Sequence, residues 1–470
     1  MYNSKSKIAT EFIDDQEILD TLEFAVRNKG NRALLEDILE KAAQFKGLNY
    51  KEASVLLECD LDDVKSRIYS LAEKIKKKFY GNRIVMFAPL YLSNYCINEC
   101  RYCPYHGSNK HIARKQLSQE DIVREVIALQ DMGHKRLALE TGEDPELCPI
   151  EYVLESIKTI YSIKHKNGAI RRVNVNIAAT TVENYKKLSD AGIGTYILFQ
   201  ETYHKPTYEY LHPKGPKHNY AYHTEAMDRA MEAGIDDVGL GVLFGLNLYK
   251  YDFVGLLMHA QHLEDAMGVG PHTISVPRIR PADDVDLDEY SNAIPDEIFE
   301  KIVAILRIAV PYTGIIMSTR ESEKTRAECL KLGVSQISGG SSTSVGGYVE
   351  KEKENSAQFE VNDTRTLDEI VNWLIKLGYI PSFCTACYRE GRTGDRFMRL
   401  VKSGAIANVC QPNALMTLKE YLEDYASEDT KIQGGKMIEA EVETLQNKDV
   451  KRIVKEHLCE LNQGKRDFRF

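Results

Sequence analysis

The sequence predicts an α/β protein built on a (β/α)8 TIM-type barrel, with helical extensions at its N-terminal and C-terminal ends. Between residues 83 and 349, short apolar runs typical of buried strands alternate with segments whose apolar residues recur every three or four positions. Eight such apolar runs occur, and eight parallel strands close most simply into a barrel. An open, doubly wound sheet is the alternative. No GxGxxG follows the first run, which disfavours a dinucleotide-binding fold.

The first 82 residues are expected to form a helical N-terminal extension. Segments 15–27, 31–45 and 61–79 carry apolar residues at helical spacing with charged residues between them. An apolar stripe of this kind needs a surface to cover, so we expect these helices to cap or wrap the barrel.

The barrel strands and helices follow from residue 83 onward. The strands are predicted at residues 84–92, 136–142, 172–180, 195–202, 237–246, 272–280, 314–322 and 336–344. The helices between them are predicted at residues 118–132, 150–166, 182–191, 220–233, 253–267, 296–310 and 323–332. Ser118 and Asp121 form a capping box before the first of these helices, and Gly133 follows its end.

Residues 350–470 are expected to form a separate C-terminal domain. A polar linker, EKEKENSAQ, occupies residues 350–358, and a helix is predicted at 366–377. A second cysteine set, a stretch rich in glycine and arginine, and charged helices follow to residue 470.

Composition limits the class of protein. The formal net charge of −9 argues against nucleic acid as a partner, because phosphate binding needs a basic surface. No apolar run is long enough to span a membrane, and the N-terminus has no apolar secretory core. We therefore expect a cytoplasmic protein whose ten cysteines are reduced thiols. The iron–sulfur clusters that two of its cysteine sets suggest, as described next, add the expectation that it works under anaerobic conditions.

The first cysteine set consists of Cys96, Cys100 and Cys103, in the segment YLSNYCINECRYCPYHG. It follows the first predicted strand, which places it at the C-terminal mouth of the barrel, where active sites of this fold lie. Three thiolates within eight residues can hold a compact soft-metal centre. A structural zinc site usually has four ligands, so an iron–sulfur cluster with one open iron is favoured over a zinc loop or an inert cluster.

The second cysteine set consists of Cys384, Cys387 and Cys410. Zinc with a fourth ligand from elsewhere in the chain is one interpretation of this spacing. However, no histidine lies between Cys387 and Cys410. Three thiolates again suggest a cluster with one open iron.

The first set resembles the signature of the radical-SAM superfamily, in which an aromatic residue, here Tyr102, precedes the third cysteine. The resemblance implies a 4Fe–4S cluster whose open iron chelates S-adenosylmethionine (SAM), and an electron from that cluster makes a 5′-deoxyadenosyl radical. The family carries a glycine-glycine-glutamate motif after the second strand, which binds the methionine amine. Thr141, Gly142 and Glu143 occupy that place, with Thr141 instead of the first glycine.

Barrel, signature and tail together resemble the HydG family, the tyrosine lyases that mature FeFe-hydrogenase, from about residue 80 to 420. The resemblance implies cleavage of L-tyrosine to p-cresol and dehydroglycine. Carbon monoxide and cyanide then form at an auxiliary 4Fe–4S cluster. They collect on an extra "dangler" iron as an Fe(CO)(CN) precursor of the hydrogenase H-cluster, and a free cysteine can serve as a ligand of that iron. An electron donor such as ferredoxin or flavodoxin, and other hydrogenase maturation proteins, are the implied partners.

Two alternatives remain open at this stage. A thiazole-pathway tyrosine lyase, the ThiH-like 2-iminoacetate synthase, shares the barrel and the tyrosine chemistry but is not expected to carry the second cluster. A non-catalytic carrier of iron–sulfur clusters needs no SAM site. The cysteine set at 384–410 favours the HydG family over the first alternative.

Two arginines are candidates for binding carboxylates. Arg320 ends the seventh strand, and a bidentate contact would suit the carboxylate of tyrosine. Related lyases hold the amino-acid carboxylate with an arginine there; a salt bridge between loops is the alternative. Arg278 and Arg280 lie on the sixth strand, and one of them is expected to meet the substrate or the SAM carboxylate, with Arg280 as our choice.

His272 begins the sixth strand and should therefore lie at the N-terminal end of the barrel. The dangler iron of the family has a histidine ligand, and imidazole suits iron. We match that ligand to His272, provided that the tail closes this end of the barrel. His259 and His262 compete for the role, but their pattern predicts the exterior of a helix.

Overall fold

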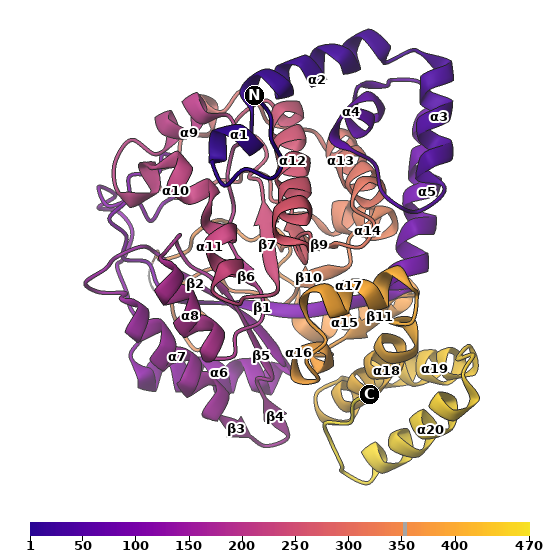
Figure 1. Ribbon diagram of the computed structural model, residues 1–470. Coiled ribbons are helices and arrows are strands. Elements are labelled where there is room, and N and C mark those ends of the chain that lie inside the picture. Colours follow the sequence, from indigo (N-terminus) through magenta and orange to yellow (C-terminus); the bar gives the residue numbers. More distant parts are fainter. Residues whose placement is uncertain (351–354) are drawn as a thin grey trace.

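The computed structural model describes residues 1–350 and 355–470. Its centre is a closed barrel of parallel strands surrounded by helices (Figure 1), which confirms the predicted fold class. Each strand pairs with the next, and the last pairs with the first. In order, the barrel strands are β1 (Arg83–Ser93), β2 (Arg136–Thr141), β5 (Arg172–Asn176), β6 (Tyr196–Ile197), β7 (Val238–Gly241), β8 (Thr273–Ser275), β9 (Gly314–Met317) and β10 (Gln336–Ser338).

Helices between these strands form the outer layer. They are α6 (Gln119–Met132), α7 (Ile150–Ser162), α8 (Val182–Asp190), α9 (Lys205–Leu211), α10 (Tyr220–Thr224), α11 (Ala226–Glu232), α12 (Tyr249–Met267), α13 (Asp296–Ala309) and α14 (Glu323–Leu332). The predicted capping box is present, because Ser118 accepts from the Asp121 amide and the Asp121 side chain accepts from the Ser118 amide. Gly133 ends α6 in the left-handed region, with φ +100°, where a side chain would be strained.

Several predicted elements are shorter or divided in the structure. The strands predicted at 237–246, 272–280, 314–322 and 336–344 are shortened to β7, β8, β9 and β10. The strand predicted at 195–202 is reduced to β6, although the Leu198 and Gln200 amides still donate to carbonyls of β7 at 3.1 and 2.9 Å. The helix predicted at 150–166 ends at Ser162, because residues 164–169 form the small hairpin β3–β4 (Lys164–His165 and Gly168–Ala169). The helix predicted at 220–233 is divided at Glu225 into α10 and α11.

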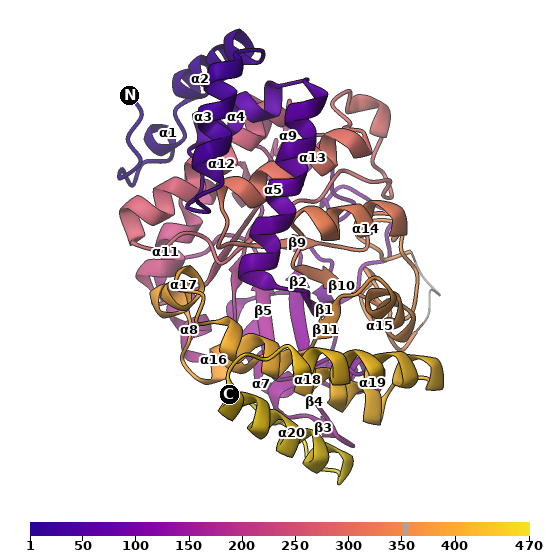
Figure 2. The ribbon, with the colours of Figure 1, turned by 90° about the vertical axis from the view of Figure 1, so that its right-hand side faces the viewer.

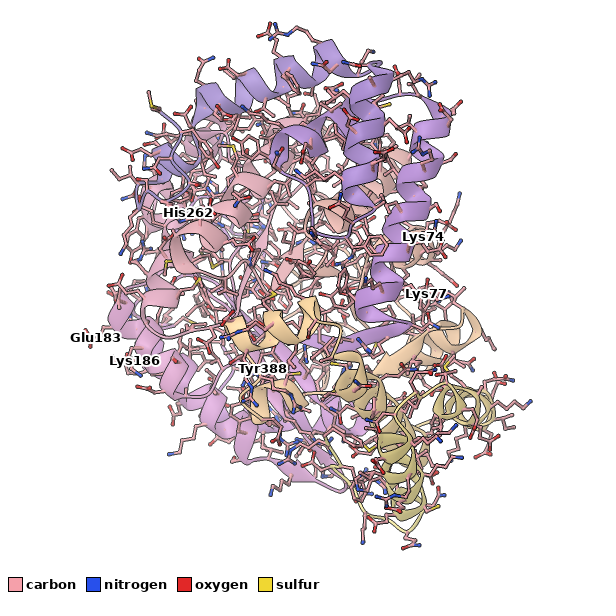
Figure 3. The ribbon with its side chains drawn as sticks, turned by 45° about the vertical axis from the view of Figure 1, so that its right-hand side comes forward. Lys74, Lys77, Glu183, Lys186, His262 and Tyr388 are labelled. Carbon is pink, nitrogen blue, oxygen red and sulfur yellow. The ribbon has the colours of Figure 1, made fainter. Side chains whose placement is uncertain are left out.

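The N-terminal residues are helical, as predicted, and lie against one side of the barrel (Figure 2). The helices α2 and α4 pack on α12, and α5 packs on α13 and α14. Lys74 and Lys77 point outward from α5 (Figure 3), while Ile75 and Phe79 of the same helix are buried. The helices of this part are α1 (Ala9–Phe12), α2 (Asp15–Asn28), α3 (Arg32–Ala42), α4 (Tyr50–Glu58) and α5 (Asp62–Tyr80).

The C-terminal residues cover the opposite end of the barrel from the cysteine loop. A short strand, β11 (Ile380–Ser382), pairs with residues 83–85 at the start of β1. Val85 pairs with both Gln336 and Ser382, so β11 lies on the edge of β1 opposite β10. The helices of this part are α15 (Leu367–Lys376), α16 (Ala386–Arg389), α17 (Gly394–Lys402), α18 (Ala407–Asp424), α19 (Glu428–Glu443) and α20 (Lys448–Asn462). None of the described helices is long and apolar enough to cross a membrane.

Candidate active site

The first cysteine set lies in the loop after β1, at the C-terminal end of the barrel, as predicted. Cys96, Cys100 and Cys103 all line one cavity at this mouth, which encloses about 1040 Å³ with its opening included. The loop is tied to the end of β2, since the backbone N–H of Ile97 donates to the carbonyl of Glu143 at 2.8 Å. The strand order of the barrel therefore brings the three thiols and the predicted SAM-binding motif to one wall.

Gly142 allows the cysteine loop to approach β2. A Cβ atom at this position would lie 2.1 Å from the backbone oxygen of Tyr95 and 3.1 Å from the Cβ of Cys96. Since no side chain fits, glycine is required by close approach rather than by its backbone angles. Thr141, which stands where the family has another glycine, ends β2 opposite Ser93 and still lines the cavity.

The environment of the three thiols suits a bound metal cluster. Burial raises the pKa of Cys96, Cys100 and Cys103, to about 12 for Cys103. Such thiols remain protonated unless a nearby cation stabilises the thiolates, and a bound metal centre does so. Within residues 1–350 and 355–470, no three His, Cys, Asp or Glu side chains are grouped to hold a single ion. The sulfurs border the cavity instead of converging on one point.

Glu143 and Tyr102 both line the cavity, as expected for SAM-binding residues. The Glu143 carboxylate accepts a hydrogen bond of 2.6 Å from Asn98 Nδ2, and burial raises its pKa. An ammonium group that pairs with a buried acid of this kind stabilises its ionised form. The Tyr102 hydroxyl lies 2.8 Å from His212 Nε2, which fixes the ring beside Cys103.

An ion pair that the sequence did not reveal stands beside the thiols. Lys217 Nζ lies 2.8 Å from Glu201 Oε1, and both residues line the mouth cavity. Burial lowers the pKa of Lys217, but the acidic groups around it, Glu201 foremost, together raise it above its usual value, so the amine keeps its charge. A cation here stabilises negative charge on the cysteine sulfurs. Lys217 lies in the short 3-10 helix Pro216–His218 and Glu201 forms a bridge with Val242, and neither belongs to a recognisable motif, so no local signal pointed to them.

The structure separates Arg278 from Arg280. Arg278 pairs with Glu321 and, at 2.7 Å, with Asp296, and it does not line the mouth cavity. Arg280 also pairs with Glu321 but borders the cavity. Of the two arginines, Arg280 is therefore the one placed to meet a bound molecule. Arg278 is held in ion pairs with other protein side chains.

A second cavity continues from the mouth into the barrel lumen and encloses about 810 Å³. Arg320 lines both cavities, and its guanidinium lies 3.5 Å from the centre of the Phe359 ring. No carboxylate of the described residues forms an ion pair with Arg320. Its charge is therefore available to a ligand rather than used in a salt bridge between loops. Glu140 and Asn176, which sequence reasoning missed, line the same two cavities.

The second cysteine set and His272 lie together at the opposite end of the barrel, as predicted. Cys384, Cys387, Cys410 and His272 line one cavity of about 780 Å³. Tyr388, which follows Cys387 on α16 (Figure 3), places its hydroxyl 3.3 Å from His272 Nε2. Burial lowers the pKa of His272, so its imidazole is neutral and can act as a metal ligand.

His259 and His262 do not reach this cavity. Both are buried in α12, so the prediction of an exterior position was wrong. The ring of Phe12 from α1 stacks on His262 with centroids 3.8 Å apart, and the Tyr203 hydroxyl lies 3.0 Å from His259 Nδ1. The N-terminal extension covers this face of α12. The sequence of α12 alone could not indicate that covering.

The lumen links the two ends. Gln336, at the start of β10, lines both the lumen cavity and the cavity that holds the second cysteine set. Arg320 and Glu140 line both the lumen cavity and the mouth cavity. The three cavities thus follow one another along the barrel interior and share lining residues.

Comparison with known proteins agrees with this geometry. A family model described as the Radical SAM superfamily matches residues 90–258, and one described as the Biotin and Thiamin Synthesis associated domain matches residues 275–380. A crystal structure of HydG, described as a maturase of the [FeFe]-hydrogenase, is 56% identical with a TM-score of 0.95, covering 98% of this chain and all of that one. The chain belongs to the HydG family.

Two further relatives extend the comparison. The FeFe-hydrogenase maturase HydG from Carboxydothermus hydrogenoformans is 40% identical with a TM-score of 0.83, covering 96% of this chain and 99% of that one. A 2-iminoacetate synthase from Salmonella typhimurium is 29% identical over 344 residues, 73% of this chain and 89% of that protein. As a HydG-family member, the chain is a radical SAM enzyme, and this superfamily implies a 4Fe–4S cluster and SAM. The buried thiols at the barrel mouth fit that cluster.

Proposed function

We propose that this chain is a radical-SAM L-tyrosine lyase that forms p-cresol and dehydroglycine, then carbon monoxide and cyanide, to build an Fe(CO)(CN) precursor of the FeFe-hydrogenase H-cluster. One observation carries the proposal: two three-cysteine sites lie at opposite ends of one barrel, with the lumen cavity between them. The HydG proteins it resembles are described as maturases of this hydrogenase.

At the mouth, Cys96, Cys100 and Cys103 hold the SAM-binding cluster. When bound, this cluster supplies the electron that cleaves SAM and yields the radical that removes hydrogen from tyrosine. The residues that bind SAM are Thr141, Gly142, Glu143, Tyr102 and Arg280. Glu143 takes the methionine ammonium group and Arg280 the carboxylate. Arg320 holds the tyrosine carboxylate, because its guanidinium borders the lumen and forms no ion pair with a carboxylate of the described residues.

At the other end, Cys384, Cys387 and Cys410 hold an auxiliary 4Fe–4S cluster. His272 is the protein ligand of the dangler iron, and free cysteine is a further candidate ligand. The position of His272 on the same cavity as the three thiols supports this assignment. Dehydroglycine reaches this end through the lumen.

The proposal extends to partners and organisation. A one-electron donor such as ferredoxin or flavodoxin reduces the cluster at the mouth, other hydrogenase maturation proteins receive the iron product, and the enzyme works anaerobically in the cytoplasm. The chain divides into a helical extension (1–82), the barrel (83–349) and a C-terminal domain (350–470), of which residues 351–354 lie outside the described part.

The test is a combined product assay on anaerobically reconstituted protein with tyrosine, SAM and reductant. We expect p-cresol, carbon monoxide and cyanide together. Changing Cys387→Ser should leave p-cresol formation largely intact and abolish assembly of the iron–carbonyl product. Loss of tyrosine cleavage in that variant would contradict the division of labour between the two clusters.

A second candidate is a tyrosine lyase that releases 2-iminoacetate as its final product, favoured by the similarity to the Salmonella synthase. The same assay distinguishes the two. Zinc instead of iron at the second cysteine set, with p-cresol but no carbon monoxide from the wild-type enzyme, would support this second candidate.

A further inference from the structure

Among the described residues, one acidic side chain that lines the mouth cavity forms no ion pair. Three glutamates line the mouth cavity. Glu201 is paired with Lys217 at 2.8 Å, and Glu143 faces the cysteine loop through Asn98. Glu140 forms no ion pair with any described residue. It is also the only one of the three glutamates that lines the lumen cavity together with Arg320.

Glu140 is held in place by the register of the barrel. Its Cα pairs with that of Tyr91 on β1 and with that of Asn176 on β5. Directly paired residues of parallel strands project to the same side, and all three side chains line the lumen cavity. Asn176 Nδ2 donates a hydrogen bond of 2.6 Å to Glu140 Oε2. Glu140 Oε1 and the amide oxygen of Asn176 accept no hydrogen bond from the described residues.

This arrangement is costly without a ligand. Burial raises the pKa of Glu140 to about 8, and the Asn176 hydrogen bond and Arg320 offset this only in part. An acid in such a site that has free acceptor capacity and forms no ion pair carries a desolvation cost, and a bound ammonium group would offset this cost. Groups of this kind are concentrated at functional sites.

We propose that Glu140, together with the Asn176 amide oxygen, binds the α-ammonium group of the amino-acid substrate. This inference rests on the proposed tyrosine lyase activity and deepens it. Arg320 would take the α-carboxylate from β9, and the aromatic ring would lie against the apolar wall that Phe199 and Phe359 supply to the lumen cavity. Three fixed contacts around one α-carbon select an L-amino acid. Glu140 and Glu143, three residues apart on β2 and its loop, would then serve the two ammonium groups of tyrosine and SAM separately.

The experiment compares two ligands that differ only in the amino group. Binding of L-tyrosine and of 3-(4-hydroxyphenyl)propionate is measured anaerobically on the iron-loaded enzyme with SAM bound. We expect Glu140→Gln, which has the same shape and keeps the Asn176 hydrogen bond, to weaken tyrosine binding about 10- to 100-fold. The affinity for the desamino analogue should stay within about twofold, because no contact to it is lost.

Two controls make the outcome decisive. Glu140→Asp keeps the charge but withdraws it by one methylene, so its loss of tyrosine affinity should be smaller; it also serves if the glutamine variant fails to fold. Glu143→Gln should weaken SAM binding instead. Equal loss of both tyrosine and its analogue, or no loss of either, would overturn the assignment of Glu140. A wild-type enzyme that binds no tyrosine would overturn the proposed function itself.

Discussion

A single missing side chain at Gly142 controls whether the cysteine loop can rest on β2. Changing Gly142→Ala would place a Cβ 2.1 Å from the Tyr95 carbonyl oxygen, so the loop must shift. We expect the cluster at the mouth to lose iron and SAM cleavage to fall at least about 100-fold, since displacements of about 1 Å at reacting groups have effects of this size. Iron content and 5′-deoxyadenosine formation provide the measurement.

The matched control for this substitution is Gly435→Ala. Nothing lies within 4 Å of a Cβ built at Gly435, which sits in α19. Alanine is the better helix former there, so cluster content and activity should remain at the wild-type level. A Gly142→Ala protein that retained its iron and cleaved SAM normally would mean that the loop tolerates the shift.

Arg320 offers a test of how the substrate carboxylate is held. Arg320→Lys keeps a positive charge but removes the planar pair of donors and the contact with the Phe359 ring. We expect the KM for tyrosine to rise about 10- to 100-fold, with SAM binding unchanged. Steady-state p-cresol formation measures this effect. Arg124→Lys, at an exposed arginine of α6, is the matched control, and an unchanged KM in Arg320→Lys would remove Arg320 from the substrate site.

The site residues differ in how far sequence could predict them. The cysteines of each set stand at a fixed spacing, and the three residues of the TGE motif are consecutive, so these patterns carried the prediction. Glu140, Glu201 and Lys217 act through partners on other strands and loops, so no spacing links them. One signal was available: Glu140 is a charged residue inside an otherwise apolar strand, RLALETG, where burial is costly unless a partner offsets it.

At the scale of an element, the start of α6 depends on its capping box. Ser118→Ala removes the hydroxyl that accepts from the Asp121 amide and donates to its carboxylate. A lost N-cap costs about 1 kcal/mol, so amide exchange in the first turn of α6 should become about fivefold faster. Hydrogen-exchange mass spectrometry over residues 119–122 measures this change, with α7 as the internal reference. An unchanged rate would show that tertiary contacts, rather than the cap, hold this turn.

Barrel elements were more predictable than the tail. Every predicted barrel strand is present, because a strand buried on both faces is nearly continuous in apolar residues, as in β1 and β2. The strand β11 was missed because IPS is only three residues long and contains proline. Its pairing with residues 83–85 joins positions almost 300 apart in the chain, which no local pattern encodes. The covering of α12 by α1 is hidden for the same reason.

At the scale of the whole molecule, one chain places two thiol sites at opposite ends of a barrel. The first site follows β1 at the C-terminal mouth, and β11 carries the second site to the start of the same strand. The barrel interior, which in this fold is normally filled by side chains, instead contains a cavity with polar and charged residues such as Glu140, Asn176 and Arg320. Under the proposed function, the intermediate would cross this interior between the two sites.

The route through the lumen can be blocked where it is narrow. Gln336 borders both the lumen cavity and the second cysteine site, and its amide nitrogen lies only 2.8 Å from where a Cβ of Gly314 would be. In so tight a place, Gln336→Phe should fill the passage, whereas Gln336→Met keeps a similar length and width. We expect p-cresol formation to continue in the phenylalanine variant, while carbon monoxide formed per p-cresol falls at least about tenfold. Glyoxylate, the hydrolysis product of dehydroglycine, should appear instead.

Because p-cresol and carbon monoxide are measured in one reaction, a general loss of activity lowers them together and leaves their ratio unchanged. A wild-type ratio in Gln336→Phe, with the methionine variant also normal, would mean that the intermediate reaches the second site by another path.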